Sequence, residues 1–133
     1  MCGIFSIIRN KPLTNKDIIL GRKGSSLLRH RGPDSSGEWI NKKSGVFIGH
    51  RRLSIIDLSS KGNQPMIRKN LVLAYNGEIY NFNEIKKSLV TKNFKFQSKS
   101  DTEVLINAWK AYGPDCLNYF DGMFGFIIWD GNN

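Results

Sequence analysis

The 133-residue sequence has no apolar run long enough to cross a membrane. Its longest hydrophobic stretches, such as residues 124–129, fall far short of the roughly 20 apolar residues of a transmembrane helix. The N-terminus lacks the apolar core and cleavage site of a signal peptide. With 40% hydrophobic and 23% charged residues, the composition is that of a folded globular chain. These features predict a cytoplasmic protein that has no membrane as a partner.

Cysteine is scarce, because the sequence contains only Cys2 and Cys116. In a chain without a secretory signal, two cysteines so far apart are poor candidates for a disulfide. Two thiols also fall short of the four ligands of a structural zinc site, so we expect no metal. Cys116 is interpreted as a small buried hydrophobic residue, which leaves Cys2 to be considered separately.

Acidic residues are outnumbered, with 11 Asp and Glu against 20 Lys and Arg and a net charge of +9. Such a balance can indicate a nucleic-acid-binding surface. However, the longest basic clusters are pairs, at residues 51–52 and 86–87, and basic and aromatic residues do not interleave as they do in base-stacking surfaces. We therefore expect solvated surface lysines and no nucleic acid as a partner.

Short hydrophobic runs alternate with helix-capping patterns along the chain. The sequence predicts strands over residues 4–8, 38–40, 46–53, 71–75, 94–97 and 123–129. Helices are expected after Thr14, Asn81 and Ser100, each followed three residues later by an acidic residue. The first should end near Arg31 and the third at Gly113, because a proline follows closely in both places.

The order of these elements favours an α+β fold, with helices layered on largely antiparallel sheet, because strands and helices follow no regular βαβ rhythm. We expect residues 71–75 to end at Asn76-Gly77, and Ile85, Leu89 and Val90 to share one face of the second helix. Residues 123–129 are apolar on both faces, which predicts a central strand. A central strand needs neighbours on both sides, so we expect the chain to be C-terminally truncated.

Cys2 directly follows the initiator methionine, whose removal would make it the N-terminal residue. The thiol would then share its residue with a free α-amino group, which is partly neutral at physiological pH and can accept the thiol proton. One residue would thus supply both a nucleophile and its base. The alternative is a cysteine without a function behind a retained Met1.

The pair Asn76-Gly77 follows a predicted strand and has two interpretations. Asn-Gly is a strong signal for a hairpin turn, but residues 78–81 do not resemble a returning strand. Alternatively, the Asn76 amide and the Gly77 N–H both point into a cleft, where they would stabilise the oxyanion of an acyl transfer. Removal of one such donor typically lowers the rate by about 10²–10³.

An amidase acting on a free amino acid also needs a cation for the α-carboxylate and an anion for the α-ammonium. Arg52 suits the first role, since a guanidinium matches a carboxylate in two-point geometry, and Asp101 suits the second. Both have structural alternatives, a solvated charge at a strand end and an acid favoured at a helix N-terminus. His30 and His50 are candidate acid–base groups, although each stands next to an arginine, which is more typical of a surface position.

Five segments taken together carry a specific resemblance. They are residues 1–4 (Met-Cys-Gly-Ile), 30–34 (His-Arg-Gly-Pro-Asp), 50–57 (His-Arg-Arg-Leu-Ser-Ile-Ile-Asp), 76–81 (Asn-Gly-Glu-Ile-Tyr-Asn) and 100–103 (Ser-Asp-Thr-Glu). In this order they resemble the N-terminal glutaminase domain of glutamine-hydrolysing asparagine synthetase. That domain is a class II glutamine amidotransferase domain of the N-terminal-nucleophile type. The resemblance runs from residue 2 to the end.

The resemblance implies stacked antiparallel sheets between helical layers, in one incomplete glutaminase domain over residues 1–133. It implies that Cys2 is the nucleophile once Met1 is removed, and that Asn76 and Gly77 form the oxyanion hole. Arg52 would hold the α-carboxylate of glutamine and Asp101 its α-ammonium. The implied glutamine site consists of Arg52, Leu53, Ser54, Ile55, Ile56, Asn76, Gly77, Glu78 and Asp101.

The implied reaction is hydrolysis of glutamine to glutamate and ammonia through a thioester on Cys2. A synthetase domain, absent from these residues but present in the full-length chain, would use the ammonia with ATP and Mg to convert aspartate to asparagine. No cofactor is expected for the glutaminase half, and a homodimer is left open. Two alternatives remain: a similar amidotransferase serving another acceptor, and a non-catalytic basic module that binds an anionic polymer.

Overall fold

A computed structural model describes residues 2–55 and 57–132, and Met1, Ile56 and Asn133 lie outside the described residues. The strands are β1 (Gly3–Ile8), β2 (Ser35–Asn41), β3 (Val46–Arg52), β4 (Met66–Arg68), β5 (Leu71–Ile79) and β6 (Gly122–Asp130). The α-helices are α1 (Asn15–Leu27), α2 (Phe82–Thr91) and α3 (Asp101–Tyr112), and short 3₁₀ helices are η1 (Leu28–His30), η2 (Ser60–Gly62) and η3 (Gly113–Tyr119). None of the helices in this described part has the length and apolar character that a membrane crossing requires.

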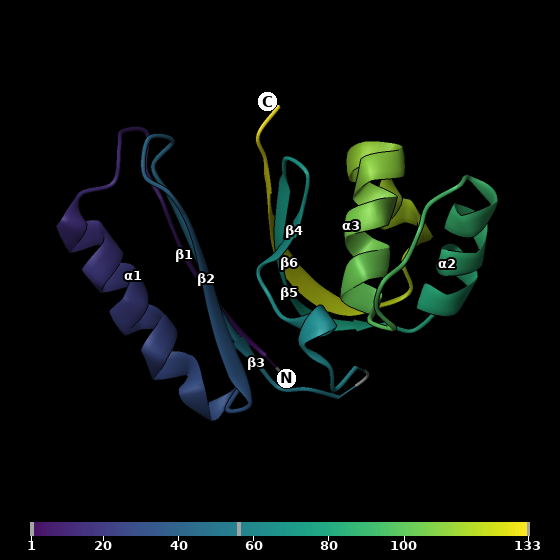
Figure 1. Ribbon diagram of the computed structural model, residues 1–133, viewed down its shortest axis with the longest axis horizontal. Helices are drawn as coiled ribbons and strands as arrows, with labels where there is room; N and C mark the ends of the chain where they lie inside the picture. The colour runs from purple at the N-terminus through teal and green to yellow at the C-terminus, as the bar shows by residue number, and fades with distance from the viewer. Residues whose placement is uncertain (1, 56, 133) are drawn as a thin grey trace.

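The strands form two antiparallel sheets that stack on each other. One sheet has the order β1-β3-β2 and the other the order β4-β5-β6. Val46 and Ile48 of β3 pack against Val72 and Ala74 of β5 in the layer between the sheets. Helix α1 covers the outer face of the first sheet, whereas α3, with α2 beside it, covers the outer face of the second (Figure 1). The predicted α+β fold, with antiparallel sheets between helical layers, is confirmed.

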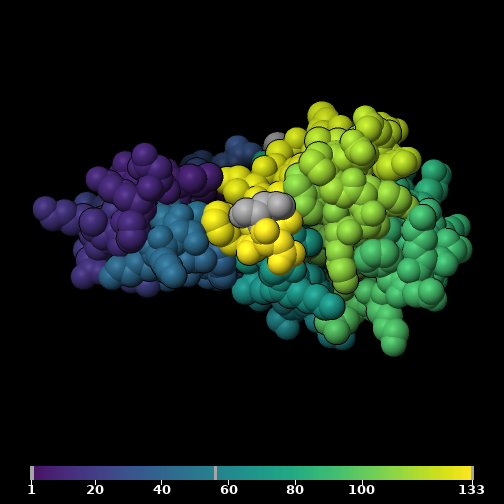
Figure 2. Space-filling model, turned by 90° about the horizontal axis from the view of Figure 1, so that it is seen from above, coloured from purple at the N-terminus to yellow at the C-terminus, as the bar shows by residue number. Residues whose placement is uncertain are grey.

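The larger hydrophobic core lies between the second sheet and its helices. Leu73 and Ile79 of β5 pack with Leu105 of α3 and Leu89 of α2, all of them inaccessible to solvent. Seen from above, the yellow C-terminal strand lies between the N-terminal segments and α3, and so occupies the middle of the molecule (Figure 2). Both halves of the chain therefore contribute to the region where the two sheets meet.

The first and third helices begin and end where the sequence predicts. Thr14 accepts a hydrogen bond from the Asp17 amide at 3.2 Å, and the Asp17 carboxylate accepts one from the Thr14 amide at 2.9 Å. The turn η1 extends this helix to His30. Ser100 caps α3 through the Glu103 amide at 3.3 Å, and the helix ends at Gly113, whose φ of +59° favours glycine.

The second helix begins after Asn81, but the Asn81 side chain does not cap it. Instead the Asn81 amide donates to the Tyr119 carbonyl at 2.9 Å and accepts from the Asp121 amide at 3.0 Å. This ties the start of α2 to the turn before β6. Ile85 and Leu89 share the buried face of this helix, whereas Val90 is 53% exposed, so the prediction that it lies on the same face is wrong.

Two strand predictions are wrong. Strand β5 continues through Asn76 and Gly77 to Ile79. Residues 94–97 form no strand, although Phe94 and Phe96 are half-buried against the core, because no neighbouring strand pairs with them. Among the described strands, β6 pairs only with β5, and its predicted central position, which requires a further strand, stays a prediction.

The apolar character of β6 is explained by the layers that cover both of its faces. Ile127 and Trp129 pack in the layer between the sheets, whereas Phe124, Phe126 and Ile128 pack on the side of the helices. A strand covered on both faces is apolar on both faces whether or not it has two strand neighbours. The pattern therefore reports layers above and below the sheet, and not the position of the strand within it.

Candidate active site

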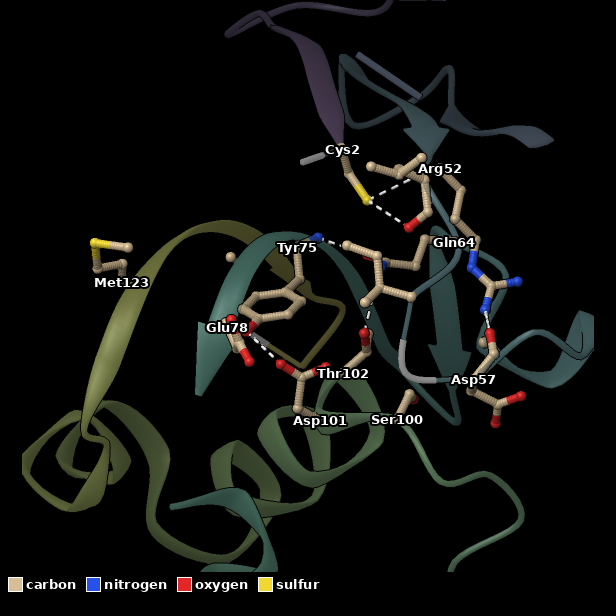
Figure 3. Close-up of a pocket in the computed structure, with 14 residues that line it drawn as sticks. Cys2, Arg52, Asp57, Gln64, Tyr75, Glu78, Ser100, Asp101, Thr102 and Met123 are labelled. Atoms are coloured by element: carbon tan, nitrogen blue, oxygen red, sulfur yellow. Dashed lines mark hydrogen bonds between the residues drawn. The ribbon is translucent and has the colours of Figure 1, made fainter. Parts of the chain in front are cut away.

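A pocket of about 130 Å³ opens where the two sheets meet, beside the N-terminus of α3 (Figure 3). Cys2 enters from the start of β1, Arg52 from the end of β3 and Asp101 from the first turn of α3. The full lining consists of Cys2, Arg52, Leu53, Ile55, Asp57, Gly62, Gln64, Tyr75, Gly77, Glu78, Ser100, Asp101, Thr102 and Met123. Residues from distant parts of the sequence thus converge on one small cavity.

The Cys2 thiol is half-buried and lies against the loop that follows β3. The Leu53 amide donates to Sγ at 3.4 Å, and Sγ lies 3.7 Å from the Leu53 carbonyl oxygen. The Arg31 Nε donates to the Cys2 carbonyl at 3.1 Å. These contacts hold Cys2 at the pocket wall. The hydrogen bond from the Leu53 amide would stabilise negative charge on the sulfur.

Arg52 is only 7% exposed, and its guanidinium holds the neighbouring loop. Nη1 donates to the Ser59 carbonyl at 2.8 Å and to Asn63 Oδ1 at 2.9 Å, and Nη2 donates to the Asp57 carbonyl. A guanidinium has five N–H donors. Within the described residues, Nε and one hydrogen of Nη2 are therefore left for a further acceptor, which can be a bound carboxylate.

Asp101 is 5% exposed and presents a carboxylate at the start of α3, where the helix dipole favours negative charge. Its Oδ2 accepts from the Tyr75 hydroxyl at 2.6 Å and from the Ile79 amide at 3.3 Å. No group of the described residues donates to Oδ1. One carboxylate oxygen in the pocket wall is thus available to a cationic ligand.

One edge of β5 faces the pocket without a strand neighbour. Strand β4 pairs with β5 only as far as Leu73. Beyond it, the Tyr75 amide donates to Gln64 Oε1 at 2.6 Å, and His50 Nε2 donates to the Tyr75 carbonyl at 3.0 Å. Since backbone groups alternate along a strand, the Gly77 N–H lies on this same edge, between the bound groups of Tyr75 and Ile79. Gly77 is also one of the residues that line the pocket.

Gly77 could not be replaced by a larger residue without moving β6. Its φ is +153°, in the region that favours glycine, and a Cβ there would overlap the Met123 carbonyl and the Phe124 backbone of β6. The glycine therefore allows the two strands to stay paired at the point where β5 borders the pocket.

Asn76 lies differently from Gly77. Strand alternation places the Asn76 side chain on the face of β5 that carries Val72 and Ala74. This face is turned toward the first sheet, β1-β3-β2. Asn76 is not among the pocket-lining residues, and its Oδ1 is buried with no partner among the described residues. The two predicted oxyanion donors thus leave the same strand in different directions.

The remaining predicted glutamine-site residues divide into two groups. Leu53, Ile55 and Glu78 line the pocket. Ser54 does not, and its amide donates to Asp34 Oδ2 at 2.7 Å. Ile56 lies outside the described residues.

Neither histidine lines the pocket. His30 is exposed, with Nδ1 3.0 Å from the Leu27 carbonyl oxygen. His50 is fully buried, so the surface position that its arginine neighbours indicated is wrong, because strand alternation turns His50 inward and Arg51 outward. Burial lowers the pKa of His50 to about 4, and the ring is neutral at pH 7.

Sequence reasoning missed several residues of the pocket. Asp57 accepts bonds from the Ser59 amide at 2.9 Å, the Ser59 hydroxyl at 2.6 Å and the Lys99 amide at 3.0 Å. The Ser59 hydroxyl and these amides lower the pKa of Asp57 to about 2. Gln64 is buried and donates to Thr102 Oγ1 at 3.3 Å. Asp57 closes one of the quoted motifs, which is a signal, but nothing in the sequence marks Gln64.

Within residues 2–55 and 57–132, no three His, Cys, Asp or Glu side chains gather in a group that could hold a metal ion. The pocket brings several chemical groups together. It offers a thiol, a backbone donor, a guanidinium and a carboxylate around one small space.

The full chain, residues 1–133, matches the family model described as a glutamine amidotransferase domain. The chain belongs to this family. The resemblance inferred from the five sequence segments is confirmed, and the glutamine amidotransferase domain described above is homologous to glutamine-hydrolysing asparagine synthetases.

Two curated relatives illustrate this homology. The amidotransferase domain is 37% identical to a putative glutamine-hydrolysing asparagine synthetase 2 of Methanocaldococcus jannaschii, over 98% of this chain and 28% of the relative. It is 39% identical to glutamine-hydrolysing asparagine synthetase 1 of Arabidopsis thaliana, over 98% of this chain and 22% of the relative. The chain therefore spans about a quarter of the length of these relatives.

Among solved structures, the domain is similar to a glutamine phosphoribosylpyrophosphate amidotransferase of Bacillus subtilis. The TM-score is 0.79 at 23% identity, over 98% of this chain and 35% of the solved chain. At this identity the similarity establishes the fold of the amidotransferase domain and no more.

Proposed function

We propose that the domain hydrolyses glutamine to glutamate and ammonia, with Cys2 as the nucleophile. The observation that carries this proposal is the shared pocket of the Cys2 thiol, the Gly77 N–H, the Arg52 guanidinium and the Asp101 carboxylate. An amide-hydrolysing site for an amino acid needs these four functions. Family membership and the glutamine-hydrolysing relatives support glutamine as the substrate.

Two buried charges would orient the substrate. The α-carboxylate of glutamine would accept from the free N–H groups of Arg52, and the α-ammonium would donate to Oδ1 of Asp101. Both side chains are less than a tenth exposed, so their interactions with a charged ligand are weakly screened by solvent. With both charged groups of the α-carbon held, the side-chain amide at the other end of glutamine is left to reach Cys2.

The chemistry would begin with transfer of the thiol proton to the α-amino group of Cys2, exposed by removal of Met1. Sγ attacks the amide carbon, and the oxyanion that forms accepts from the Gly77 N–H. The Asn76 amide, which does not line the pocket in this structure, would be a second donor after its side chain turns toward Cys2. The amine then protonates the leaving nitrogen, and ammonia departs as the C–N bond breaks. Water hydrolyses the resulting thioester to glutamate and restores the thiol.

In a full-length protein we propose that a synthetase domain receives the ammonia. It would use ATP and Mg to convert aspartate to asparagine, while the glutaminase half would need no cofactor. The names of the relatives and their greater length support this arrangement.

The decisive test compares the two cysteines. Cys2→Ala is expected to abolish glutamate release, by about 10³-fold or more, because the nucleophile is lost. Cys116→Ala is the matched control, since burial raises the pKa of this thiol to about 11 and keeps it inert in the core. Equal turnover by the wild type and Cys2→Ala would contradict the proposal. Intact-mass measurement of the wild type should show a chain that starts at Cys2.

A further inference from the structure

Tyr75 lies in the centre of the pocket, between Cys2 on one side and Asp101 on the other (Figure 3). It is 3% exposed, and all three of its polar groups are bound. Gln64 accepts from its amide, His50 donates to its carbonyl, and its hydroxyl donates to Asp101. The roles proposed for Cys2, Arg52 and Asp101 do not themselves require the Tyr75 hydroxyl.

The bond between Tyr75 and Asp101 is a strong one. Its length is 2.6 Å, as expected for a hydroxyl that donates to a carboxylate. Burial and the Asp101 carboxylate both raise the pKa of Tyr75, so the hydroxyl keeps its proton and remains a donor. The Tyr75 hydroxyl is therefore the donor of this bond at neutral pH.

The same bond decides which oxygen of Asp101 faces a ligand. Oδ2 is occupied by the Tyr75 hydroxyl and, at the longer distance of 3.3 Å, by the Ile79 amide. The terminal torsion of an aspartate is broad and nearly two-fold, so a carboxylate without such an anchor rotates easily. Anchored at Oδ2, Asp101 presents Oδ1 as its free acceptor.

Other side chains near Asp101 do not supply this anchor. Ser100 is committed to the Glu103 amide and Thr102 to the Gln64 side chain. Tyr75 itself is rigid, because its backbone is clamped from both sides by buried side chains. The hydroxyl thus connects the oxyanion edge of β5 to the carboxylate at the start of α3.

We propose that Tyr75 is a positioning residue that orients Asp101 toward the α-ammonium of the substrate, and so gives the site its preference for α-amino acids. This inference rests on the proposed glutamine hydrolysis. It predicts that the hydroxyl affects substrate binding and leaves the reacting atoms unaffected. The effect should also depend on the presence of the α-ammonium group.

The test uses Tyr75→Phe, which removes one oxygen atom, with Tyr119→Phe as the matched control. Tyr119 is 55% exposed and lies outside the pocket. Two ligands are compared: glutamine as the substrate, and 4-carbamoylbutanoate, which lacks only the α-ammonium, as a competitor. In Tyr75→Phe, KM for glutamine should rise about tenfold while kcat stays within about twofold, as for loss of one hydrogen bond to a charged group.

The inhibition constant of 4-carbamoylbutanoate should stay within about twofold in Tyr75→Phe, since this ligand does not use Asp101. An equal weakening of both ligands would mean that Tyr75 only supports the pocket, and would overturn the inference. An unchanged KM would overturn it too. If the wild type releases no glutamate at all, the proposed glutaminase function itself fails, and this inference falls with it.

Discussion

Asn76 and Gly77 are neighbours in β5, but they present their polar groups in different directions. Gly77 offers its N–H at the free edge of β5, whereas Asn76 projects from the face toward the first sheet. A turn would have placed both groups on one side, but a strand separates them. The side-chain oxygen Oδ1 of Asn76 is buried without a partner among the described residues.

Asn76→Ala is therefore expected to lower kcat for glutamine by about 10²–10³ with little change in KM. The free energy of unfolding should change little, because the substitution also removes a buried unsatisfied acceptor. Steady-state kinetics and urea unfolding measure the two effects. Asn107→Ala, at a second buried asparagine with an unpartnered amide, is the control. A raised KM with kcat intact would show that Asn76 binds substrate and does not stabilise the oxyanion.

Residues with charge or special backbone freedom could be found from the sequence. Cys2, Arg52 and Asp101 all reach the pocket, as their motifs predict, whereas their roles in catalysis and binding stay predictions. Gln64 and Tyr75 were missed, because their importance comes from contacts across the fold and not from a local pattern.

At the scale of elements, α1 packs on the first sheet through its smallest side chains. Gly21 and Ser25 are its buried residues, whereas Leu20 and Leu27 are exposed. A Cβ at Gly21 would lie 2.7 Å from the Phe47 ring, and one at Gly24 would overlap the Phe5 ring. The helix therefore lies close to the sheet because glycine leaves room for two aromatic rings.

Gly24→Ala should lower the free energy of unfolding by about 1–3 kcal/mol, since overpacking outweighs the gain of about 1 kcal/mol in helix propensity. Gly125→Ala is the matched control, because nothing lies within 4 Å of a Cβ at that position. Urea unfolding of both variants is the measurement. A more stable Gly24→Ala variant would show that the close approach of α1 to Phe5 does not limit its packing.

Helices could be predicted better than strands, for a physical reason. The caps at Thr14 and Ser100 are local hydrogen bonds between neighbouring residues, so their signals lie within a few positions of the sequence. Strand partners are distant: β5 pairs with β6 about 50 residues away. The three-residue β4 was missed, and residues 94–97 have a strand-like pattern without a partner.

At the scale of the whole molecule, His50 links the two stacked sheets. It belongs to β3 of the first sheet, and its Nε2 donates to the Tyr75 carbonyl in β5 of the second. Because burial holds the pKa of His50 near 4, the native protein binds no proton there at pH 5 to 6. The unfolded chain, with a histidine pKa of about 6.5, does.

The stability contribution of a neutral His50 is therefore complete above about pH 6.5 and declines as pH falls toward 4. The decrease in the free energy of unfolding should reach about 3 kcal/mol, because His50 takes up a proton in the unfolded state but stays neutral in the native state. Urea unfolding at a series of pH values should show this slope in the wild type and in His30→Gln, and a flatter one in His50→Gln. Asp57, with a pKa lowered to about 2, does not add to the slope in this window, because its stabilisation is lost only as pH falls from about 4 toward 2. Identical slopes in all three proteins would contradict the assignment.

The α+β class and the layers could be predicted, because five short motifs identify a family whose architecture is shared along the whole chain. The order of strands and the position of the pocket could not. They depend on which strand edges meet, and the sequence pattern of β6 reports only that both of its faces are covered.

The most direct test of the central claim is the mass of the protein during turnover. Acid quenching of the wild type mixed with glutamine should yield a species heavier by one glutamine less one ammonia. Proteolytic digestion should place this group on an N-terminal Cys2, as a thioester that free thiols or hydroxylamine remove. Glutamate release without any adduct on Cys2, or an adduct on another residue, would contradict the account.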